Sequence, residues 1–318
     1  MGSFSELTFA DLLISDDGYF FRYLEGQEKP VIKVPDEYAA EIDTLKKHLY
    51  SRPDNGEDSF FMFHEGAPYR ISVVETIEGR GFFLRKLKYP VPDLSTLGFE
   101  KGVLSTLRSL GKSSQGLILV AGATGSGKST SVYSILKEYL LNYGDILISI
   151  EDPPEIPSQG QLGNGIWFQI DAVSAGGYEK GMISAMRYNP KYIFMGEIRT
   201  PTAAREAIRA AVNGHLVITT IHANSIQGAI FALQQIAASG SDIELIRSIL
   251  GDGLLCVLHQ KLEFCQGGGR RLKTAFLYAK DGPSVASKIR SGKLELLNTE
   301  IEIQKIKLSN GINLINLS

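Results

Sequence analysis

Cysteine and tryptophan are scarce in this sequence, whose 318 residues contain two cysteines and one tryptophan. Cys256 and Cys265 are too few to build the disulfide framework of a small secreted protein. The segment that they bound, CVLHQKLEFC, has no closely spaced pair of zinc ligands. We therefore expect buried or incidental thiols, in a protein of the cytoplasm.

Long hydrophobic runs are also missing. The longest, such as Leu117–Ala121 and Leu216–Ile218, are far shorter than the roughly 20 residues that cross a bilayer. The first residues, MGSFSELTFADLL, lack the basic start and the continuous apolar stretch of a signal peptide. We expect neither a secretory leader nor a transmembrane helix.

No sign of charge dominates, because 33 basic residues face 35 acidic ones. This balance gives no indication of direct nucleic-acid binding or of attraction to an anionic membrane. Apolar residues make up 43% and charged residues 21%, as in ordinary globular proteins. The length allows roughly two domains with cores of their own.

Residues 1–90 have the texture of a small α+β domain. A helix is predicted over 36–50, where Ala39, Ile42, Leu45 and Leu49 recur at helical spacing. Short strand-like runs and a polar loop surround it, the strands at 19–24, 30–35, 59–64, 69–76 and 81–87 and the loop at 51–58. The two prolines and the glycine of KYPVPDLSTLG then predict a linker at 91–100.

Residues 101–318 alternate apolar strands with helices. The strands LILVA, ILISI, YIFMG and LVITTI are continuously apolar, which is typical of a parallel sheet covered on both faces. In the helix predicted from TPTAAREAIRAAVNGH, Thr200 can cap the start, Pro201 suits the first turn and Asn213–Gly214 suit the end.

A glycine-rich loop follows the first of these strands. Residues 122–129, GATGSGKS, match the phosphate-loop pattern G-x-x-x-x-G-K-[ST] at every position. Backbone N–H groups and the amino end of the following helix surround phosphate oxygens in such a loop. Lys128 is expected to neutralise the phosphates of ATP, and Ser129 to reach Mg²⁺. The predicted nucleotide-binding residues are Gly122, Ala123, Thr124, Gly125, Ser126, Gly127, Lys128, Ser129 and Thr130.

Three other apolar strands end in polar residues. Glu197 ends YIFMGE, Glu151 follows ILISI, and His222 follows LVITTI. Ligands of parallel α/β sheets bind at the carboxyl ends of the strands. A carboxylate there can help to hold hydrated Mg²⁺ or orient the attacking water, so Glu197 is the first candidate and Glu151 its rival.

Taken in order, these segments resemble four motifs of the secretion and pilus ATPases, the motors of type II and type IV secretion and of type IV pili. GATGSGKST, ISIEDPPE, MGEIRT and NGHLVITTIHANS resemble their Walker A, Asp-box, Walker B and His-box motifs. VLHQKL resembles their Gln-Arg-Leu motif, with Lys261 in place of arginine. The resemblance covers most of residues 60–318. It implies an α/β fold, with a RecA-like P-loop motor domain and a mainly parallel sheet, after a smaller α+β, PAS-like N-terminal domain.

The same resemblance implies a ring, usually hexameric, in which ATP lies between one motor domain and the N-terminal domain of a neighbour. Arg70, Arg80 and Arg85 fall where the superfamily keeps basic residues that reach the γ-phosphate, although they also fit surface positions on strands. His222 is expected to sense the γ-phosphate and Arg199 to brace the same region. Such an arginine raises turnover by roughly 10³–10⁵, so a lone subunit should bind ATP and hydrolyse it slowly.

Two departures bear on the branch of the superfamily. Ala123 replaces the usual proline of the phosphate loop, and the four-cysteine metal motif of extension-type and type II secretion members is absent. The chain resembles most the compact branch of pilus-retraction and Dot/Icm-like or thin-pilus (type IVB) ATPases. The expected partners are inner-membrane and cytoplasmic components of the apparatus, with the chain at the inner face of the bacterial cytoplasmic membrane.

Two other functions stay open at this point. A P-loop phosphotransferase would need an acceptor site and lid arginines, and no segment nominates either. A scaffold gated by nucleotide, with little turnover, would not need the complete set of Lys128, Ser129, Glu151, Glu197 and His222.

Overall fold

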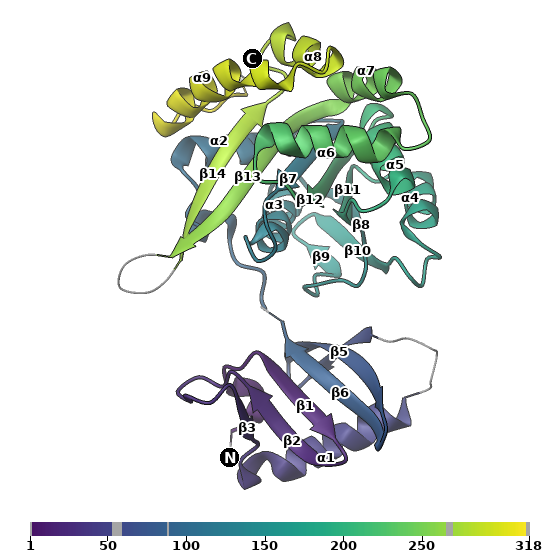
Figure 1. The fold of residues 1–318 in the computed structure, drawn as a ribbon. Coiled ribbons are helices and arrows are strands. Elements are labelled where there is room, and N and C mark those ends of the chain that lie inside the picture. The colour runs from purple at the N-terminus through teal and green to yellow at the C-terminus, as the bar shows by residue number, and fades with distance from the viewer. Residues whose placement is uncertain (1, 53–58, 88, 265–269, 316–318) are drawn as a thin grey trace. The chain divides into compact units, whose positions relative to one another are not determined.

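The computed structural model describes residues 2–52, 59–87, 89–264 and 270–315. Most of the loop expected at 51–58, together with Cys265, lies outside these ranges. The chain divides into two compact units, residues 1–90 with 155–157, and residues 91–154 with 158–318 (Figure 1). Among the described residues, every helix is too short or too polar to cross a membrane.

The first unit is an antiparallel sheet of six strands with one long helix. In the sheet the strands lie in the order β3-β2-β1-β6-β5-β4. Its elements are η1(Phe4–Glu6), β1(Asp11–Ser15), β2(Gly18–Arg22), β3(Val31–Lys33), α1(Asp36–Ser51), β4(Ser59–His64), β5(Ala67–Thr76) and β6(Gly79–Lys86).

Helix α1 covers one face of this sheet. Its apolar stripe buries Ile42, Leu45 and Leu49 against inward-facing side chains such as Leu12 and Leu84. The strands alternate between buried and more exposed positions, as expected for a sheet that is covered on one face. The α+β organisation predicted for this unit is confirmed.

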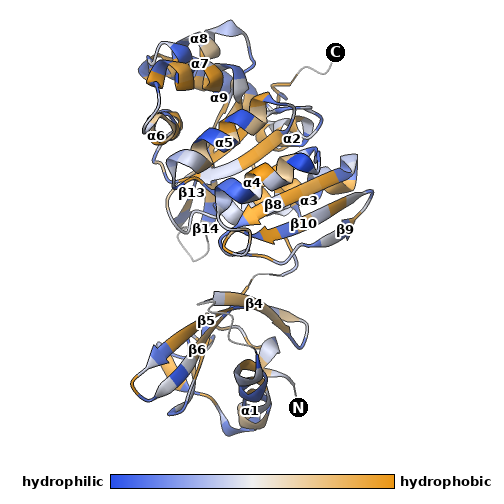
Figure 2. Cartoon of the chain, turned by 90° about the vertical axis from the view of Figure 1, so that its right-hand side faces the viewer, coloured by the Kyte–Doolittle hydropathy of each residue, from blue (hydrophilic) through white to orange (hydrophobic). Residues whose placement is uncertain are grey.

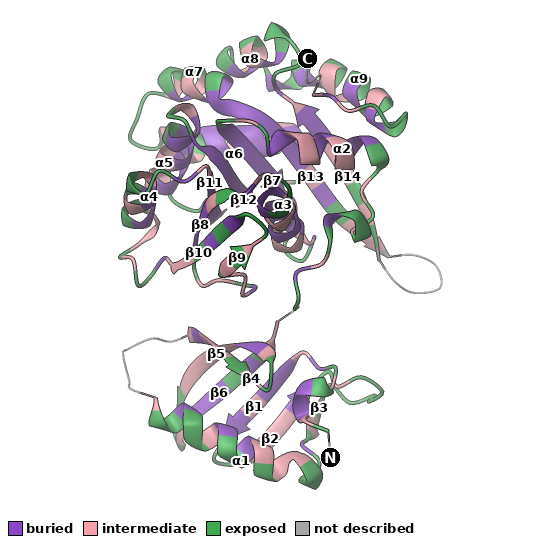
Figure 3. Cartoon of the chain, turned by 180° about the vertical axis from the view of Figure 1, so that it is seen from behind, coloured by how far each residue is buried: buried purple, intermediate pink, exposed green. Residues whose placement is uncertain are grey.

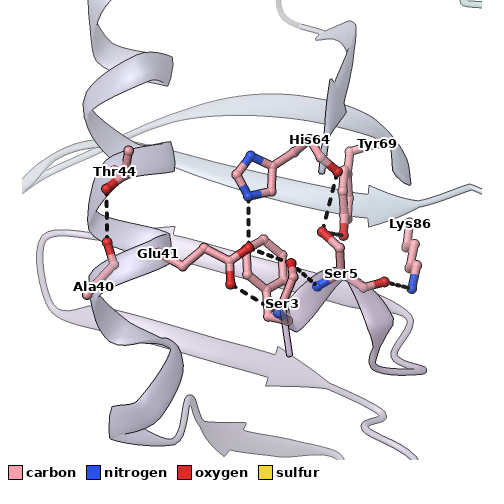
Figure 4. Close-up of polar contacts among 9 residues, drawn as sticks. Ser3, Ser5, Ala40, Glu41, Thr44, His64, Tyr69 and Lys86 are labelled. Carbon is pink, nitrogen blue, oxygen red and sulfur yellow. Dashed lines mark hydrogen bonds and ion pairs between the residues drawn. The ribbon is translucent and has the colours of Figure 1, made fainter. Parts of the chain in front are cut away.

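A polar network holds the amino-terminal segment onto the first unit (Figure 4). Glu41 of α1 accepts hydrogen bonds from the Ser3 hydroxyl at 2.6 Å and the Phe4 amide at 3.1 Å, and its Oε1 lies 3.1 Å from His64 Nε2. Tyr69 donates to the Ser5 hydroxyl at 3.1 Å. The contacts fix η1 so that Phe4 is completely buried.

The second unit is built on a sheet of eight strands in the order β14-β13-β7-β12-β11-β8-β10-β9. Its strands are β7(Gly116–Ala121), β8(Asp145–Glu151), β9(Gly160–Leu162), β10(Gly165–Asp171), β11(Tyr192–Glu197), β12(Leu216–Ile221), β13(Leu254–Phe264) and β14(Arg270–Tyr278). Its helices are η2(Leu94–Thr96), α2(Lys101–Leu110), α3(Lys128–Tyr143), α4(Tyr178–Arg187), α5(Pro201–Val212), α6(Ile226–Ala238), α7(Ile243–Gly253), α8(Pro283–Arg290), η3(Leu294–Leu297) and α9(Asn298–Ser309).

The six strands from β13 to β10 are parallel, and β14 and β9 are antiparallel additions at the two sides. Helices α4, α5 and α6 pack on one face, and α3 packs on the other. The central strands are therefore buried on both sides and apolar along their length (Figures 2 and 3). The prediction of a mainly parallel α/β sheet is confirmed.

Two local features show how the sequence forms this unit. Thr200 caps α5, since its hydroxyl accepts a hydrogen bond from the Ala203 amide at 3.3 Å, and Pro201 occupies the first turn as predicted. The segment that enters the unit packs on α3, where Ser134 donates to the Pro92 carbonyl at 2.8 Å and Lys137 lies 2.8 Å from Asp93.

Candidate nucleotide site

The phosphate loop joins the carboxyl end of β7 to the amino end of α3. Gly127 precedes the helix with a φ of +85°, a conformation that residues with a Cβ rarely adopt. In the described chain no side chain caps the start of α3. The first N–H groups of the helix, with its positive dipole end, thus remain available to an anion.

The opposite end of the loop lies against β13. A Cβ at Gly122 would meet the backbone oxygen of Gln260 at 2.4 Å, so this position needs glycine. The Gln260 side chain is buried and its Nε2 donates to the Ser126 carbonyl at 2.8 Å. The loop is thereby held from both sides, by its own helix and by a neighbouring strand.

Lys128 lies inside the loop. Its side chain is buried, and the ammonium donates to the carbonyls of Gly122 at 2.9 Å and Ala123 at 3.0 Å. The outer arch, from Ala123 to Gly125, is exposed, and a Cβ added at Gly125 would meet nothing within 4 Å. The positive charge of Lys128 thus lies beneath the exposed residues of the loop.

These features fit a phosphate group with its magnesium ion. Two buried polar atoms beside the loop, the Ser126 hydroxyl and Gln260 Oε1, have no hydrogen-bond partner among the described atoms. Ser129 and Thr130 occupy the first turn of α3 and are half-buried. The donor groups are backbone N–H groups, hydroxyls and one ammonium, the set that binds phosphate oxygens.

Strand register brings the other predicted residues to the same edge of the sheet. Ala121 pairs with Ile221, Thr220 pairs with Glu197, and Met195 pairs with Ile150. The phosphate loop, His222, Glu197 and Glu151 therefore leave the sheet at one level, on four neighbouring strands. Among the described residues, no cluster of three or more histidine, cysteine or acidic side chains forms a metal-binding group.

Glu197 joins two other predicted residues. Its Oε1 lies 2.9 Å from His222 Nε2, and its Oε2 accepts from Arg199 Nε at 2.8 Å and Nη2 at 2.6 Å. The hydrogen bond to Glu197 raises the pKa of Arg199, which keeps the guanidinium charged. The structure thus brings Glu197, Arg199 and His222 into one cluster, as the sequence pattern suggested.

Glu151 is more deeply buried than Glu197, with 3% of its surface exposed. Both of its oxygens accept hydrogen bonds, Oε2 from the Tyr133 hydroxyl and Oε1 from Gln169 Nε2. Its Cα and Cγ lie 3.6 Å from the position that a Cβ on Gly196 would take. The two candidate acids are therefore set on adjacent strands, Glu151 in the interior and Glu197 nearer the surface.

The three predicted arginines lie in the first unit. Arg70 and Arg85 are paired across β5 and β6, so they share the face of the sheet that α1 does not cover. Arg85 Nε lies 2.9 Å from the buried carboxylate of Asp11, which also binds Arg22. Arg80 is near the other end of β6, where its Nε lies 2.6 Å from Glu75.

Several side chains that contact the predicted residues have no motif of their own. Tyr133 and Gln169 bind Glu151, and Asp11 binds Arg85. Only Gln260 had a sequence signal, because it lies within VLHQKL. The single described cysteine, Cys256, is buried without a disulfide partner, and burial raises the pKa of its thiol.

A parallel sheet whose first central strand leads into such a loop defines a P-loop α/β protein. The profile of the type II/IV secretion system protein family matches residues 43–308, and the chain belongs to this family.

Curated relatives match about two thirds of the chain. Competence protein ComGA of Bacillus subtilis is 28% identical over 218 residues, 68% of this chain and 60% of that protein. Type II secretion system protein E of Klebsiella pneumoniae is 32% identical over 225 residues, 70% of this chain and 42% of that protein. The chain thus spans between 42% and 60% of the length of these two relatives.

Solved structures match nearly the whole chain. The crystal structure of the pilus retraction motor PilT with bound ADP has a TM-score of 0.78 at 26% identity, over 98% of this chain and 92% of that one. The X-ray structure of the Legionella pneumophila ATPase DotB has a TM-score of 0.74 at 19% identity, over 96% of this chain and 89% of that one. The similarity to DotB, at 19% identity, shows that the two chains share a fold.

Proposed function

We propose that the chain is an ATP hydrolase that drives a type IV secretion or type IV pilus machine. The observation that carries this proposal is the common edge of the sheet, where Lys128 in its loop, Glu151, Glu197 and His222 follow four neighbouring strands. Family membership and the likeness to a pilus motor with bound ADP support the same function.

In this proposal the loop binds the triphosphate of ATP. The ammonium of Lys128 exchanges its contacts with the Gly122 and Ala123 carbonyls for phosphate oxygens. Ser129, with Glu197 mostly through water, would hold Mg²⁺, and that ion would supply neutralisation of the phosphate charge when bound. Glu197 orients the attacking water, with Glu151 as its rival, and His222 reports the γ-phosphate through its contact with Glu197.

We further propose a ring, with six subunits as the expected number, in which an arginine of one subunit completes the site of the next. Arg70, Arg80 and Arg85 are the candidates. An arginine at the γ-phosphate is worth roughly 10³–10⁵ in rate. We propose a corresponding division of the chain into domains. Residues 1–90 form the domain that supplies the arginine, residues 91–100 form a linker, and residues 101–318 form the motor domain. The machine components at the inner face of the cytoplasmic membrane are the proposed partners.

Phosphate release measured across a dilution series of the full chain tests this function. Specific activity should rise with protein concentration as rings form, and Lys128→Ala should abolish it. Lys101→Ala, at an exposed lysine that begins α2, serves as the matched control and should keep full activity. Activity that does not depend on concentration would remove the ring from the proposal. A phosphorylated small-molecule product would show that the chain is a phosphotransferase instead of an ATP hydrolase. Tight ATP binding without turnover would show that it is a nucleotide-gated scaffold.

A further inference from the structure

Glu151 ends β8 in a setting that is unusual for a carboxylate, because it is almost completely buried. A buried charge is stable only where hydrogen bonds replace the water that it has lost. Here two side chains from different elements supply them, Tyr133 from α3 and Gln169 from β10. Glu151 therefore has little freedom to turn.

The orientation of the Gln169 amide follows from its backbone partners. Its Oε1 accepts from the amide of Ser158 at 2.6 Å and from that of Gln159 at 3.0 Å. Only the carbonyl end of the amide can accept from two N–H groups. The NH₂ end must then face the interior, where Nε2 lies 3.4 Å from Glu151 Oε1 and 3.3 Å from the Tyr133 hydroxyl.

Tyr133 is held as firmly. Its ring packs against Trp167 at 5.2 Å and against Phe194 at 5.8 Å, measured between ring centres. The Trp167 indole is itself fixed, because its Nε1 donates to the Ser149 hydroxyl at 2.9 Å. This aromatic packing restrains the Tyr133 ring, and its hydroxyl donates to Glu151 Oε2.

We propose that Tyr133 and Gln169 are positioning residues for Glu151 in ATP hydrolysis. The inference rests on the proposed function, since it assigns these residues a task in that reaction. Tyr133 lies five residues after Lys128 on the helix that begins at the phosphate loop. It therefore ties the carboxylate to the element that binds the phosphates. Gln169 ties the same carboxylate to the segment that precedes β9.

Positioning predicts a loss in turnover rather than in nucleotide affinity. Tyr133→Phe removes the hydroxyl and keeps the ring. Gln169→Glu keeps oxygens that accept from Ser158 and Gln159 but replaces the neutral donor that faces Glu151 with a second acid group, which repels the Glu151 carboxylate or shares a proton with it. Each should lower kcat by about tenfold, the size expected for one hydrogen bond to a charged group, and leave the Kd for ADP within about twofold.

Tyr139→Phe is the matched control. Tyr139 lies on the same helix, is equally buried, and donates its hydroxyl to the Leu107 carbonyl at 2.7 Å, away from Glu151. Its loss of one buried hydrogen bond should leave kcat within about twofold of the original value. Thermal midpoints compare the folding of the variants, and Gln169→Glu keeps the test open should Tyr133→Phe fail to fold.

Three results would each overturn the proposal. The first is an equal kcat for Tyr133→Phe and Tyr139→Phe, with the kcat of Gln169→Glu unchanged, and the second is a loss of ADP affinity instead of kcat. The third is full turnover by Glu151→Gln, because Tyr133 and Gln169 would then have no catalytic group to position. A readout that needs no turnover separates this inference from the function itself. The Gln169 side-chain NH₂ resonances should shift in Glu151→Gln and Tyr133→Phe and stay in place in Tyr139→Phe. If the unmodified chain releases no phosphate, the proposed ATP hydrolase function is refuted. If the Gln169 resonances do not shift, the proposed contact between Gln169 and Glu151 is refuted.

Discussion

Glu197 and His222 meet at the ends of adjacent parallel strands, with 2.9 Å between Oε1 and Nε2. The second oxygen of Glu197 binds Arg199 through two nitrogens. One carboxylate thus links the strand β11, the turn that follows it and the segment after β12. Glu197 therefore contacts both His222 and Arg199 directly.

Glu197→Gln tests the first candidate for the catalytic acid. The amide keeps the shape of the side chain but cannot carry charge, so turnover should fall by about 10²–10⁴ while nucleotide affinity stays within about threefold. Phosphate release and the binding of a fluorescent ADP analogue measure the two quantities. Glu244→Gln, in the first turn of α7, is the control. A larger loss in Glu151→Gln than in Glu197→Gln would transfer the role to Glu151.

Arg85→Ala tests the sharing of the site between subunits. The variant should bind ATP normally and turn it over at least 100-fold more slowly. Mixed with Lys128→Ala it should regain activity, because each interface between the Lys128 of an Arg85→Ala subunit and the Arg85 of a Lys128→Ala subunit has both groups intact. Arg22→Ala is the control, since Arg22 is exposed and binds the same Asp11 carboxylate. Failure to regain activity with Arg70, Arg80 and Arg85 in turn would place all three outside the site.

Much of this architecture could be predicted because its signals are local. The continuous apolar strands 117–121 and 216–221 reflect burial on both faces, and the pattern from Gly122 to Ser129 reflects a backbone that must surround an anion. The carboxyl ends of parallel strands meet at one edge, so Glu197 and His222 could be grouped before any coordinates were known.

The contacts that fix these residues could not be predicted, because they join distant parts of the chain. Asp11 and Arg85 are 74 positions apart, and Ser126 and Gln260 are 134 apart. Strand β1 itself escaped prediction because DLLIS is only five residues long, although the turn residues Asp16, Asp17 and Gly18 follow it. Positioning residues such as Gln169 follow from tertiary register rather than from any pattern within one segment.

Gln260→Leu tests the contact between β13 and the phosphate loop. Leucine fills a similar volume but cannot donate to the Ser126 carbonyl, so a buried acceptor loses its partner. The loop should become less ordered, and the Kd for ADP should rise by about tenfold for a loss of that kind. Isothermal titration measures it. Gln304→Leu is the matched control: Gln304 is equally buried and binds the Tyr278 backbone. An equal loss of affinity in both variants would reduce the effect to general destabilisation.

Glu41 links pH to the docking of the amino-terminal segment. Burial raises its pKa, but hydrogen bonds from Ser3, the Phe4 amide and His64 outweigh that effect, and the net pKa lies below the ordinary value. The unfolded segment therefore binds a proton more readily than the docked one. The stabilisation is complete above the ordinary glutamate pKa of about 4.3 and disappears as the pH falls through the lower pKa of the docked state.

Glu41→Gln should loosen this segment at pH 6, because the Ser3 hydroxyl and the Phe4 N–H donate to different oxygens of Glu41, and an amide has an oxygen at only one of these two positions. Hydrogen exchange of the Phe4 amide in the full chain should be about fivefold to tenfold faster than in the original protein, for a loss of roughly 1 kcal/mol. The ratio between the two proteins should shrink toward one as the pH falls through the lowered pKa of the docked carboxylate, where Glu41 becomes protonated. Glu37→Gln, at an exposed position in the first turn of α1, should leave the exchange unchanged at every pH. A ratio that did not change as the pH fell, or an equal effect of Glu37→Gln, would show that the charge of Glu41 does not hold the segment.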